Sequence, residues 1–216
     1  MSLALYAHPF SSYCQKVLVA LYESGTSFEY RKLESAATMA ELKKRWPLGK
    51  FPLLVDDGRS VIEATCIIEH LDLHHPGSRR LIPADAAAAL EVRFLDRFFD
   101  NYLATPQQKI VFDMLRPVDR RDSYGIGEAR RTLDTAYAWL DRHMAGREWA
   151  AGDAFTLADC AAAPFLFYAD WTHRIAAFGN VHAYRKRLLT RPSFARAVNE
   201  ARPYRKLFPL GAPARD

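Results

Sequence analysis

The order of apolar and polar positions at the start of the chain predicts a strand, a helix and a second strand. Residues 3–8 have the composition of a short strand, and residues 28–33 alternate apolar with polar side chains. Between them, residues 14–21 place apolar side chains at i, i+3, i+4 and i+7, which predicts one face of a helix that ends at Gly25. The crossover is long enough for the two strands to pair in parallel.

A polar segment separates this unit from a predicted hairpin. Residues 51–55 read as a strand, the Asp-Gly pair at residues 57–58 is a turn signal, and residues 59–62 read as the return strand. A helix then begins at Ala64 and ends at the sequence His-His-Pro-Gly of residues 74–77.

No convincing strand pattern follows Asp85, so the rest of the chain is predicted to be helical. Residues 86–117 read as one long helix, in which Pro106 removes a backbone hydrogen bond and predicts a kink. A second helix is expected to end at Gly146, and residues 156–171 are apolar nearly all round, which predicts a central buried helix. Two shorter helices are expected near residues 183–189 and 193–200.

These patterns divide the chain into two domains. Residues 1–76 form a predicted α/β unit, residues 77–86 a linker rich in proline and charge, and residues 87–216 an all-helical unit. The total of 216 residues, half of them hydrophobic, allows two small domains with compact cores.

Charge and cysteine content narrow the class of protein. The first 76 residues hold 8 Lys and Arg against 9 Asp and Glu, whereas the remainder holds 22 against 16. No nucleic-acid-binding motif accompanies this basic excess, so we interpret it as a solvated face of the last helices and expect no nucleic-acid partner. Three widely spaced cysteines read as reduced thiols. We find no apolar run long enough for a membrane span and no signal peptide.

Two serines and a cysteine precede the first predicted helix. Ser11 or Ser12 can act as its N-cap, and a cap needs only one hydroxyl. The other hydroxyl is then free to stabilise an anion, such as a thiolate, beside the helix N-terminus. Cys14 lies in the first turn but also on the apolar face, and we predict a buried, inert thiol. Cys66 and Cys160 are also predicted to be core residues.

Pro52 and Glu63 are candidates for ligand binding. Proline inside an apolar strand is tolerated if the Phe51–Pro52 bond is cis at the start of the strand, and the Phe51 peptide can then pair with an extended ligand. A trans proline on an edge strand is the alternative. Glu63 precedes the helix that begins at Ala64, where it either binds a ligand ammonium group or only caps its own helix.

Two further motifs are assigned to structure rather than to chemistry. His70, His74 and His75 include a metal-like i, i+4 pair, but two histidines without a nearby third ligand make a weak site, so we interpret them as a solvated helix end and predict no metal site. Thr156 and Asp159 fit an acidic variant of the capping box at the start of the buried helix.

The motifs, in their order and spacing, resemble a known family. The segments FSSYCQKV from residue 10, GKFPLL from residue 49, VIEATC from residue 61 and FTLADC from residue 155 together look like a cytosolic glutathione S-transferase of the serine type, similar to the zeta, theta, delta or tau classes. The resemblance implies a thioredoxin-like N-terminal domain, an all-α C-terminal domain and transfer of glutathione to an electrophilic, apolar small molecule.

The resemblance also assigns roles to residues around the first helix. Ser11 corresponds to the serine that donates to the glutathione sulfur, and Ser12 stands beside it as a possible substitute. Cys14 falls where thioredoxins carry the second cysteine of their redox pair, and Ser11 where they carry the first. The resemblance therefore implies that the pair is absent because the chemistry uses an external thiol.

Further glutathione contacts are implied at the second half of the N-terminal domain. Phe51 and the cis-proline Pro52 match the pair that binds the cysteinyl backbone, Lys50 stands where a polar residue approaches the peptide, and Glu63 matches the acid that binds the γ-glutamyl group. The family has Ser or Thr after this acid, whereas this chain has Ala64, whose backbone N–H is left to bind the γ-glutamyl carboxylate.

The remaining expectations concern the second substrate and the assembly. An electrophile pocket is expected between the domains, lined by Phe10, Tyr102, Phe112 and Tyr168. The resemblance implies a cytoplasmic homodimer that acts in detoxification, with glutathione as co-substrate and without a metal. The alternatives are a non-catalytic binding or assembly protein on the same fold, and a glutathione-dependent thiol oxidoreductase that uses Cys14.

Overall fold

The structure, a computed structural model, describes residues 2–77 and 80–216 and has the predicted α/β and all-α parts. The first part contains strands β1 (Leu3–Ala7), β2 (Glu29–Lys32), β3 (Leu53–Asp56) and β4 (Arg59–Ile62), with helices α1 (Ser12–Ser24), α2 (Ala36–Arg45) and α3 (Ala64–His74). The second part contains α4 (Ala86–Phe98), α5 (Thr105–Met114), α6 (Ser123–His143), α7 (Leu157–Thr172), α8 (Gly179–Thr190) and α9 (Pro192–Ala201). Short 3-10 helices cover Val118–Arg120 and Arg202–Leu207.

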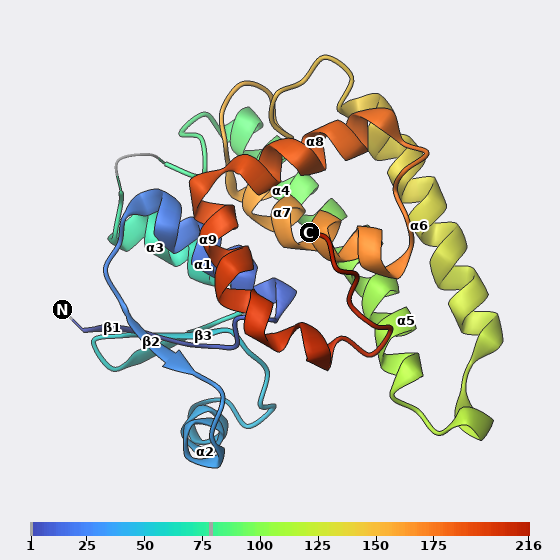
Figure 1. The fold of residues 1–216 in the computed structure, drawn as a ribbon. Coiled ribbons are helices and arrows are strands. Elements are labelled where there is room, and N and C mark those ends of the chain that lie inside the picture. The colour runs from blue at the N-terminus through green and yellow to red at the C-terminus, as the bar shows by residue number, and fades with distance from the viewer. Residues whose placement is uncertain (1, 78–79) are drawn as a thin grey trace.

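The four strands form one mixed sheet in the order β2-β1-β3-β4. β1 and β2 pair in parallel, as the predicted crossover requires, and β3 pairs antiparallel with both β1 and β4. Helices α1 and α3 lie between the sheet and the helical domain, and α2 lies on the opposite side of the sheet (Figure 1). There Leu42 of α2 packs on Tyr6, Leu53 and Val55 in a small separate core.

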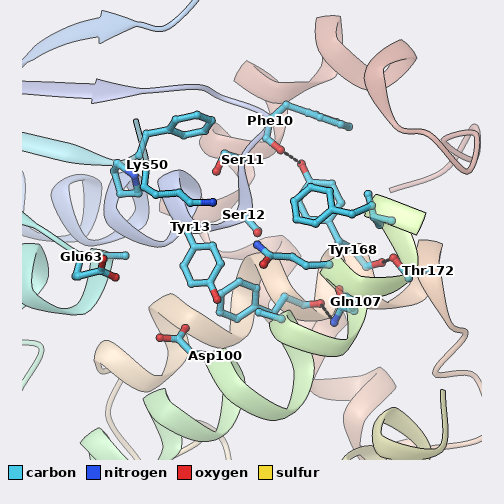
Figure 2. A pocket seen from close by; sticks show the side chains of 18 of the residues that line it. Phe10, Ser11, Ser12, Tyr13, Lys50, Glu63, Asp100, Gln107, Tyr168 and Thr172 are labelled. Atoms are coloured by element: carbon cyan, nitrogen blue, oxygen red, sulfur yellow. Dashed lines mark hydrogen bonds between the residues drawn. The ribbon is translucent and has the colours of Figure 1, made fainter. Parts of the chain in front are cut away.

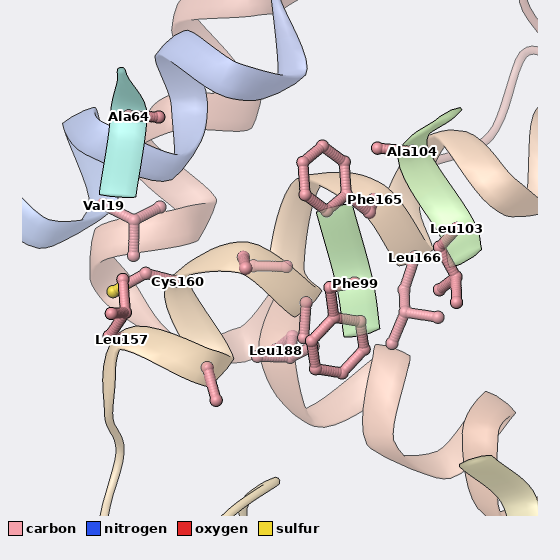
Figure 3. Close-up of a cluster of buried hydrophobic side chains, with 14 of the residues drawn as sticks. Val19, Ala64, Phe99, Leu103, Ala104, Leu157, Cys160, Phe165, Leu166 and Leu188 are labelled. Carbon is pink, nitrogen blue, oxygen red and sulfur yellow. The ribbon is translucent and has the colours of Figure 1, made fainter. Parts of the chain in front are cut away.

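Helix α7 forms the centre of the main core. All but its last two residues are buried, as its apolar composition predicts. Figure 3 shows Phe165, Leu166 and Cys160 of this helix among side chains from α1, from the π-helical segment Phe99–Ala104 and from α8. The predicted capping box is confirmed at its start, where the backbone N of Thr156 donates to Oδ2 of Asp159 at 2.8 Å. Asp159 also accepts a hydrogen bond from the backbone N of Ala150, at 2.9 Å, so it ties the preceding loop to α7.

The long helix that was predicted for residues 86–117 is interrupted earlier than expected. α4 and α5 are joined by a π-helical segment, Phe99–Ala104, and Pro106 lies in the first turn of α5. Proline lacks an N–H donor, and its ring crowds the carbonyl group four residues before it. The regular i→i−4 hydrogen bonds are therefore disturbed on its N-terminal side, where the wider π-helical turn lies. The next helix, α6, which was predicted by its end at Gly146, begins at Ser123, because Asp122 accepts a hydrogen bond from Gly125 N and caps it.

Part of the predicted linker 77–86 is held in the protein core. Leu81 and Ile82 are 5% and 8% exposed. Leu81 N donates to Oδ1 of Asp72 at 2.8 Å, and Leu81 O accepts from Leu157 N at 2.9 Å. Residues 78 and 79 of that linker, and Met1 of the first predicted domain, lie outside the described residues, and the domain boundaries stay a prediction. Among the described residues, no helix is both long and apolar enough to cross a bilayer.

A buried ammonium group connects the two parts of the structure. Lys16 of α1 is fully buried, and its Nζ lies 2.5 Å from Oδ1 of Asp96 and 3.0 Å from Oδ1 of Asp100, both in the helical domain. Nζ is also 3.0 Å from the hydroxyl of Thr65 in α3, which donates to Oδ2 of Asp96 at 2.8 Å. α1, α3 and the α4 region are therefore joined at a single buried charge.

We predict that replacing this lysine destabilises the whole protein. Lys16→Met removes the buried ammonium group and leaves the buried carboxylates of Asp96 and Asp100 paired with Arg97, whose side chain is 51% exposed. We expect this loss to cost about 3–5 kcal/mol in the free energy of unfolding. Equilibrium unfolding in urea measures this loss. Lys109→Ala is the matched control, because the Lys109 side chain is 46% exposed and lies 3.7 Å from Asp122, so its loss changes the free energy by less than about 0.5 kcal/mol. A loss below about 1 kcal/mol in Lys16→Met contradicts the role given to this contact.

Candidate active site

A cavity of about 760 Å³ opens between the α/β part and the helical part. Ser11, Ser12 and Tyr13 lie at its centre, Lys50 and Glu63 on one side, and Gln107, Tyr168 and Thr172 on the other (Figure 2). The same cavity therefore has one wall from the sheet domain and one from the helices. Of the eleven residues predicted for the site, ten line it: Phe10, Ser11, Ser12, Lys50, Phe51, Pro52, Glu63, Ala64, Phe112 and Tyr168.

The two serines have different structural roles. Ser11 has extended backbone angles and is the N-cap of α1, where its Oγ accepts a hydrogen bond from Cys14 N at 3.4 Å. This bond uses a lone pair of the oxygen and leaves the hydroxyl proton available to a ligand. Ser12 is the first residue of α1 and is half-buried in the cavity wall. Both hydroxyls lie at the N-terminus of a helix, where partial positive charge favours a bound anion.

The loop before these serines is fixed by side chains from two helices. Gln15 of α1 donates its Nε2 to Pro9 O at 2.9 Å, and the Tyr168 hydroxyl of α7 donates to Phe10 O at 2.9 Å. The rings of Phe10 and Tyr168 also meet edge to face, with centroids 5.4 Å apart. The position of Ser11 relative to the helical wall is thus set by hydrogen bonds as well as by packing.

Cys14 is fully buried beneath the serines, as predicted. Burial in apolar surroundings raises the pKa of its thiol to about 12, and hydrogen bonds from Ser11 and from the His8 backbone only partly oppose this. The thiol is therefore protonated at neutral pH and has little nucleophilic character. Cys160 is buried as predicted, but the prediction for Cys66 is wrong, because Cys66 is exposed on α3. The buried face of α3 is formed by its neighbours Ile67 and Ile68, and Cys66 lies outside that face.

The sheet side of the cavity presents backbone groups and one acid. The Phe51–Pro52 peptide bond is cis, which settles the alternative that the sequence left open. β3 begins one residue later, at Leu53, so Phe51 precedes the strand instead of belonging to it. Glu63 is exposed, has a left-handed φ of 67° and makes no side-chain cap bond to α3. A strained backbone at a residue that does not cap its helix is typical of a ligand contact.

The helical side is aromatic and includes residues that the sequence analysis missed. Tyr13 and Phe165 meet edge to face at 5.1 Å, and Gln107 donates its Nε2 to Phe165 O at 3.1 Å. The C-terminal segment adds Leu207, Phe208 and Pro209 to the lining, and Phe208 stacks on Tyr168 at 6.1 Å. No local pattern marked this segment, because it reaches the cavity only by folding back over α7.

Tyr102 is the one predicted pocket residue that the structure places elsewhere. Tyr102 is not among the described residues that line the cavity. It belongs to the π-helical segment Phe99–Ala104, is 51% exposed and packs its ring on Phe98 at 5.7 Å. Asn101 and Ala104 of the same segment line the cavity, so Tyr102 lies on another face of the helix. Phe112 does line the cavity, at its rim, with 56% of its surface exposed.

Charged groups of the interdomain network, which is formed around Lys16 by Thr65, Asp96 and Asp100, also reach the cavity. Arg97 and Asp100 line it, and Arg97 donates to Oδ2 of Asp96 at 2.7 Å. Burial raises the pKa of Asp100, and the neighbouring Lys16 ammonium group opposes that effect. The floor of the cavity is therefore polar next to Tyr13, whereas the wall formed by α7 and the C-terminal segment is apolar.

The histidines at the end of α3 do not form the solvated helix end that was predicted. The side chains of His70 and His75 are only 10% and 14% exposed, and Nε2 of each lies within 2.8 Å of Oδ2 of Asp56. Asp56 is the last residue of β3, whereas the histidines lie at the end of α3, so the local spacing of the histidines does not include their carboxylate partner. His74 is exposed, as expected, with its ring centroid 4.5 Å from that of His70.

Comparison with family models gives two matches that together cover most of the chain. Residues 5–79 match the model described as glutathione S-transferase, N-terminal domain, and residues 84–187 match the model described as glutathione S-transferase, C-terminal domain. Among curated proteins, glutathione S-transferase GstB of Escherichia coli strain K12 is 28% identical over 160 residues, which cover 70% of this chain and 74% of GstB. A probable maleylacetoacetate isomerase of Caenorhabditis elegans is 25% identical, with 92% of this chain and 94% of the relative covered.

Solved structures give the same result with nearly complete coverage. A glutathione S-transferase from Methylobacterium radiotolerans, in complex with glutathione sulfonate, is 30% identical and superposes with a TM-score of 0.80 over 92% of this chain and 95% of its own. A glutathione S-transferase from Methylobacillus flagellatus with GSH bound is 25% identical, with a TM-score of 0.81 over 91% of this chain and 98% of its own.

The burial of the thiols predicts their reactivity. In the native protein, a chromogenic disulfide reagent should label Cys66 quickly, whereas Cys14 and Cys160 react only after unfolding. Raising the pH from about 7 to about 9 should leave Cys14 unreactive, because its pKa of about 12 keeps the thiol protonated over that range. Cys66→Ser serves as the control and should leave no fast phase. A fast phase that persists in Cys66→Ser and vanishes in Cys14→Ser contradicts the assignment.

Proposed function

The chain belongs to the glutathione S-transferase family, and we propose that it holds the glutathione thiolate at Ser11 and transfers it to an apolar electrophile bound against the helical wall. It is a glutathione transferase with the family's two-domain fold, and glutathione is its co-substrate. The observation that carries the proposed chemistry is the position of Ser11. Its hydroxyl lines the cavity at a helix N-terminus, between the Phe51–Pro52 loop and the aromatic wall.

Glutathione is proposed to bind as an extended peptide along the sheet side of the cavity. The backbone N–H and C=O of Phe51 precede β3 at the cavity wall and supply the hydrogen bonds of an added strand. The carboxylate of Glu63 binds the γ-glutamyl ammonium group, and the exposed ammonium group of Lys50 binds a terminal carboxylate. These charges are complementary to a ligand that carries both signs.

The γ-glutamyl carboxylate is proposed to bind at the N-terminus of α3, where Ala64 supplies only a backbone N–H. The neighbouring hydroxyl, that of Thr65, is already engaged with Asp96 and Lys16 in the interdomain network, so it does not replace the hydroxyl that Ala64 lacks. A hydroxyl hydrogen bond to this carboxylate would contribute about 1.5–3 kcal/mol, so without it the affinity at this end depends on the Ala64 N–H and on the charged contact of Glu63.

The Ser11 hydroxyl is proposed to lower the pKa of the bound thiol. A hydrogen bond to a charged group contributes about 1.5–3 kcal/mol, which corresponds to about one to two pKa units of the glutathione thiol. More thiolate is then present near neutral pH, and the thiolate is the nucleophile. Its sulfur forms a bond to an electrophilic carbon, and the leaving group departs with the electron pair of the bond that breaks.

The second substrate is proposed to be an apolar molecule, with an aromatic ring or similar flat surface. Phe10, Phe165, Tyr168 and Phe208 give the helical wall edge-to-face and stacked ring contacts, which suit such a surface. Detoxification of apolar electrophiles is the role that this pocket supports, and we place the protein in the cytoplasm, where glutathione and reduced thiols coexist.

The two alternatives are not favoured. A thiol oxidoreductase needs a reactive thiolate, and burial raises the pKa of Cys14 to about 12. A non-catalytic assembly protein is not favoured because the relatives described above are named as enzymes, a glutathione S-transferase and a probable isomerase, and the cavity is open beside Ser11.

The role of Ser11 predicts a change in the ionisation of bound glutathione. In Ser11→Ala, the pKa of the bound thiol should rise by about one to two units, and the rate constant for conjugation at neutral pH should fall about 10- to 100-fold. The pH dependence of conjugation with a general aromatic electrophile, together with thiolate absorbance, measures both quantities.

Two variants separate this role from simple binding. Ser12→Ala should leave the pKa of the bound thiol unchanged. Glu63→Gln should weaken glutathione binding at least tenfold in calorimetry. It should not move the pKa of the thiol, because the contact that it removes is to the γ-glutamyl group and not to the cysteinyl residue. If Ser12→Ala abolishes activity and Ser11→Ala does not, the proposal has the wrong serine.

We further propose a homodimer that uses the outer faces of α3 and α4. Leu73, Leu90 and Phe94 are 67%, 68% and 51% exposed there, although they are large and apolar. A two-fold contact between these faces would cover them in both copies.

Sedimentation velocity should therefore give twice the chain mass of 24.6 kDa. Phe94→Glu should shift the protein toward the monomer, because it places a charge in an apolar contact. Tyr124→Glu is the control, since Tyr124 is 77% exposed on α6, away from this face. A monomer at all micromolar concentrations of the native chain would contradict the proposal.

A further inference from the structure

A second cluster of ligand-type side chains lies away from the cavity, at the opposite end of α3. It consists of Asp56 at the end of β3, His70 in α3 and His75 directly after α3. One carboxylate oxygen and two imidazole nitrogens lie within 4.8 Å of one another. α3 has 11 residues, so its C-terminal end is about 16 Å from Glu63 and Ala64 at its start.

We propose that Asp56, His70 and His75 form a binding site for a divalent transition-metal ion of the zinc type. Two imidazoles and one carboxylate are the donor set that zinc takes in three-ligand sites, with a fourth position left for water. None of the residues proposed to bind glutathione takes part. The site is therefore independent of the transferase chemistry and does not rest on it.

The geometry of the cluster is close to that of a zinc site. Nε2 of His70 and Nε2 of His75 lie 2.8 Å and 2.7 Å from Oδ2 of Asp56. Ligand atoms around a tetrahedral zinc ion with bonds of about 2.0–2.1 Å lie about 3.3 Å apart. The two nitrogen–oxygen distances need to lengthen by only about half an ångström, and the two nitrogens already lie within 4.8 Å of each other, so small rotations of the side chains can surround an ion.

Burial fixes the ligands and leaves one side open. The side chains of Asp56, His70 and His75 are 14%, 10% and 14% exposed, so the fold already restricts their rotamers before any ion binds. Little conformational entropy remains to be lost on binding. All three are nevertheless partly accessible, which gives an ion a path to the site and a water molecule the fourth position.

Proton balance is satisfied without a further reactant. In the metal-free protein, each Nε2 carries a proton and donates it to Oδ2 of Asp56. In the metal-bound protein, the ion takes the place of these two protons, and each neutral imidazole carries its proton on Nδ1 instead. The carboxylate stays ionised in both states and supplies the negative charge that partly neutralises the ion.

A bound ion would connect parts of the chain that are distant in the sequence. His70 and His75 hold the last turns of α3, and Asp56 holds the tip of the β3–β4 hairpin. Cross-linking these elements would stabilise the α/β domain, because the ion binds the folded state and not the unfolded one.

Calorimetric titration with Zn²⁺ tests the proposal directly. The protein must carry no histidine tag, must first be treated with a chelator, and must be free of glutathione, whose thiol binds the metal. We expect one ion per chain and a higher melting temperature in its presence. His70→Ala, His75→Ala and Asp56→Asn should each weaken Zn²⁺ binding at least tenfold. Their transferase activity without metal should match that of the native chain.

His74→Ala is the matched control, because His74 is the exposed neighbour and is not part of the cluster. It should bind Zn²⁺ as the native chain does. Co²⁺ gives a second readout that does not depend on stability, since its visible absorption should indicate a four-coordinate site in the native chain and in His74→Ala only. The proposal is overturned if the native chain takes up no ion, or if His74→Ala weakens binding as much as His70→Ala does.

Discussion

The buried ammonium group of Lys16 is the contact on which the arrangement of this protein depends. It is fully removed from solvent and is held by Asp96 and Asp100 from the helical domain and by the hydroxyl of Thr65 from α3. A buried charge without its partners is strongly unfavourable, so α1, α3 and the α4 region can be separated only at a high cost in free energy. These same elements carry Ser11, Glu63 and part of the cavity floor.

The cavity follows from that constraint. α1 is packed between the sheet and α7, so its N-terminus, with Ser11 as cap, opens at the junction of the two domains. The sheet contributes backbone groups and charges, which suit a peptide with both signs of charge. The helices contribute aromatic side chains, which suit an apolar partner. The different character of an exposed sheet margin and a helical bundle therefore gives the cavity one polar wall and one apolar wall.

The position of Cys14 explains why the thiol of this reaction comes from outside the chain. A thioredoxin-like fold presents a helix N-terminus that can activate a cysteine, but here the thiol lies one turn further in, beneath Ser11, where desolvation raises its pKa. A hydroxyl stands at the position that is open to solvent. Serine cannot take part in thiol–disulfide exchange, yet it can donate a hydrogen bond to the thiolate of a bound peptide.

Local patterns in the sequence predicted most of the elements, because caps, periodicity and proline positions act within one or two helical turns. The resemblance of the ordered motifs to a family supplied the fold family and most of the eleven residues expected at the cavity, ten of which line it. The local patterns also placed Ser11 at a helix start and gave the capping box of Thr156 and Asp159. Only the tertiary structure decided which distant side chains meet: Tyr168 with Phe10, the C-terminal Phe208 with the aromatic wall, and Asp56 with His70 and His75. Such contacts join residues far apart in the chain, and no local pattern encodes them.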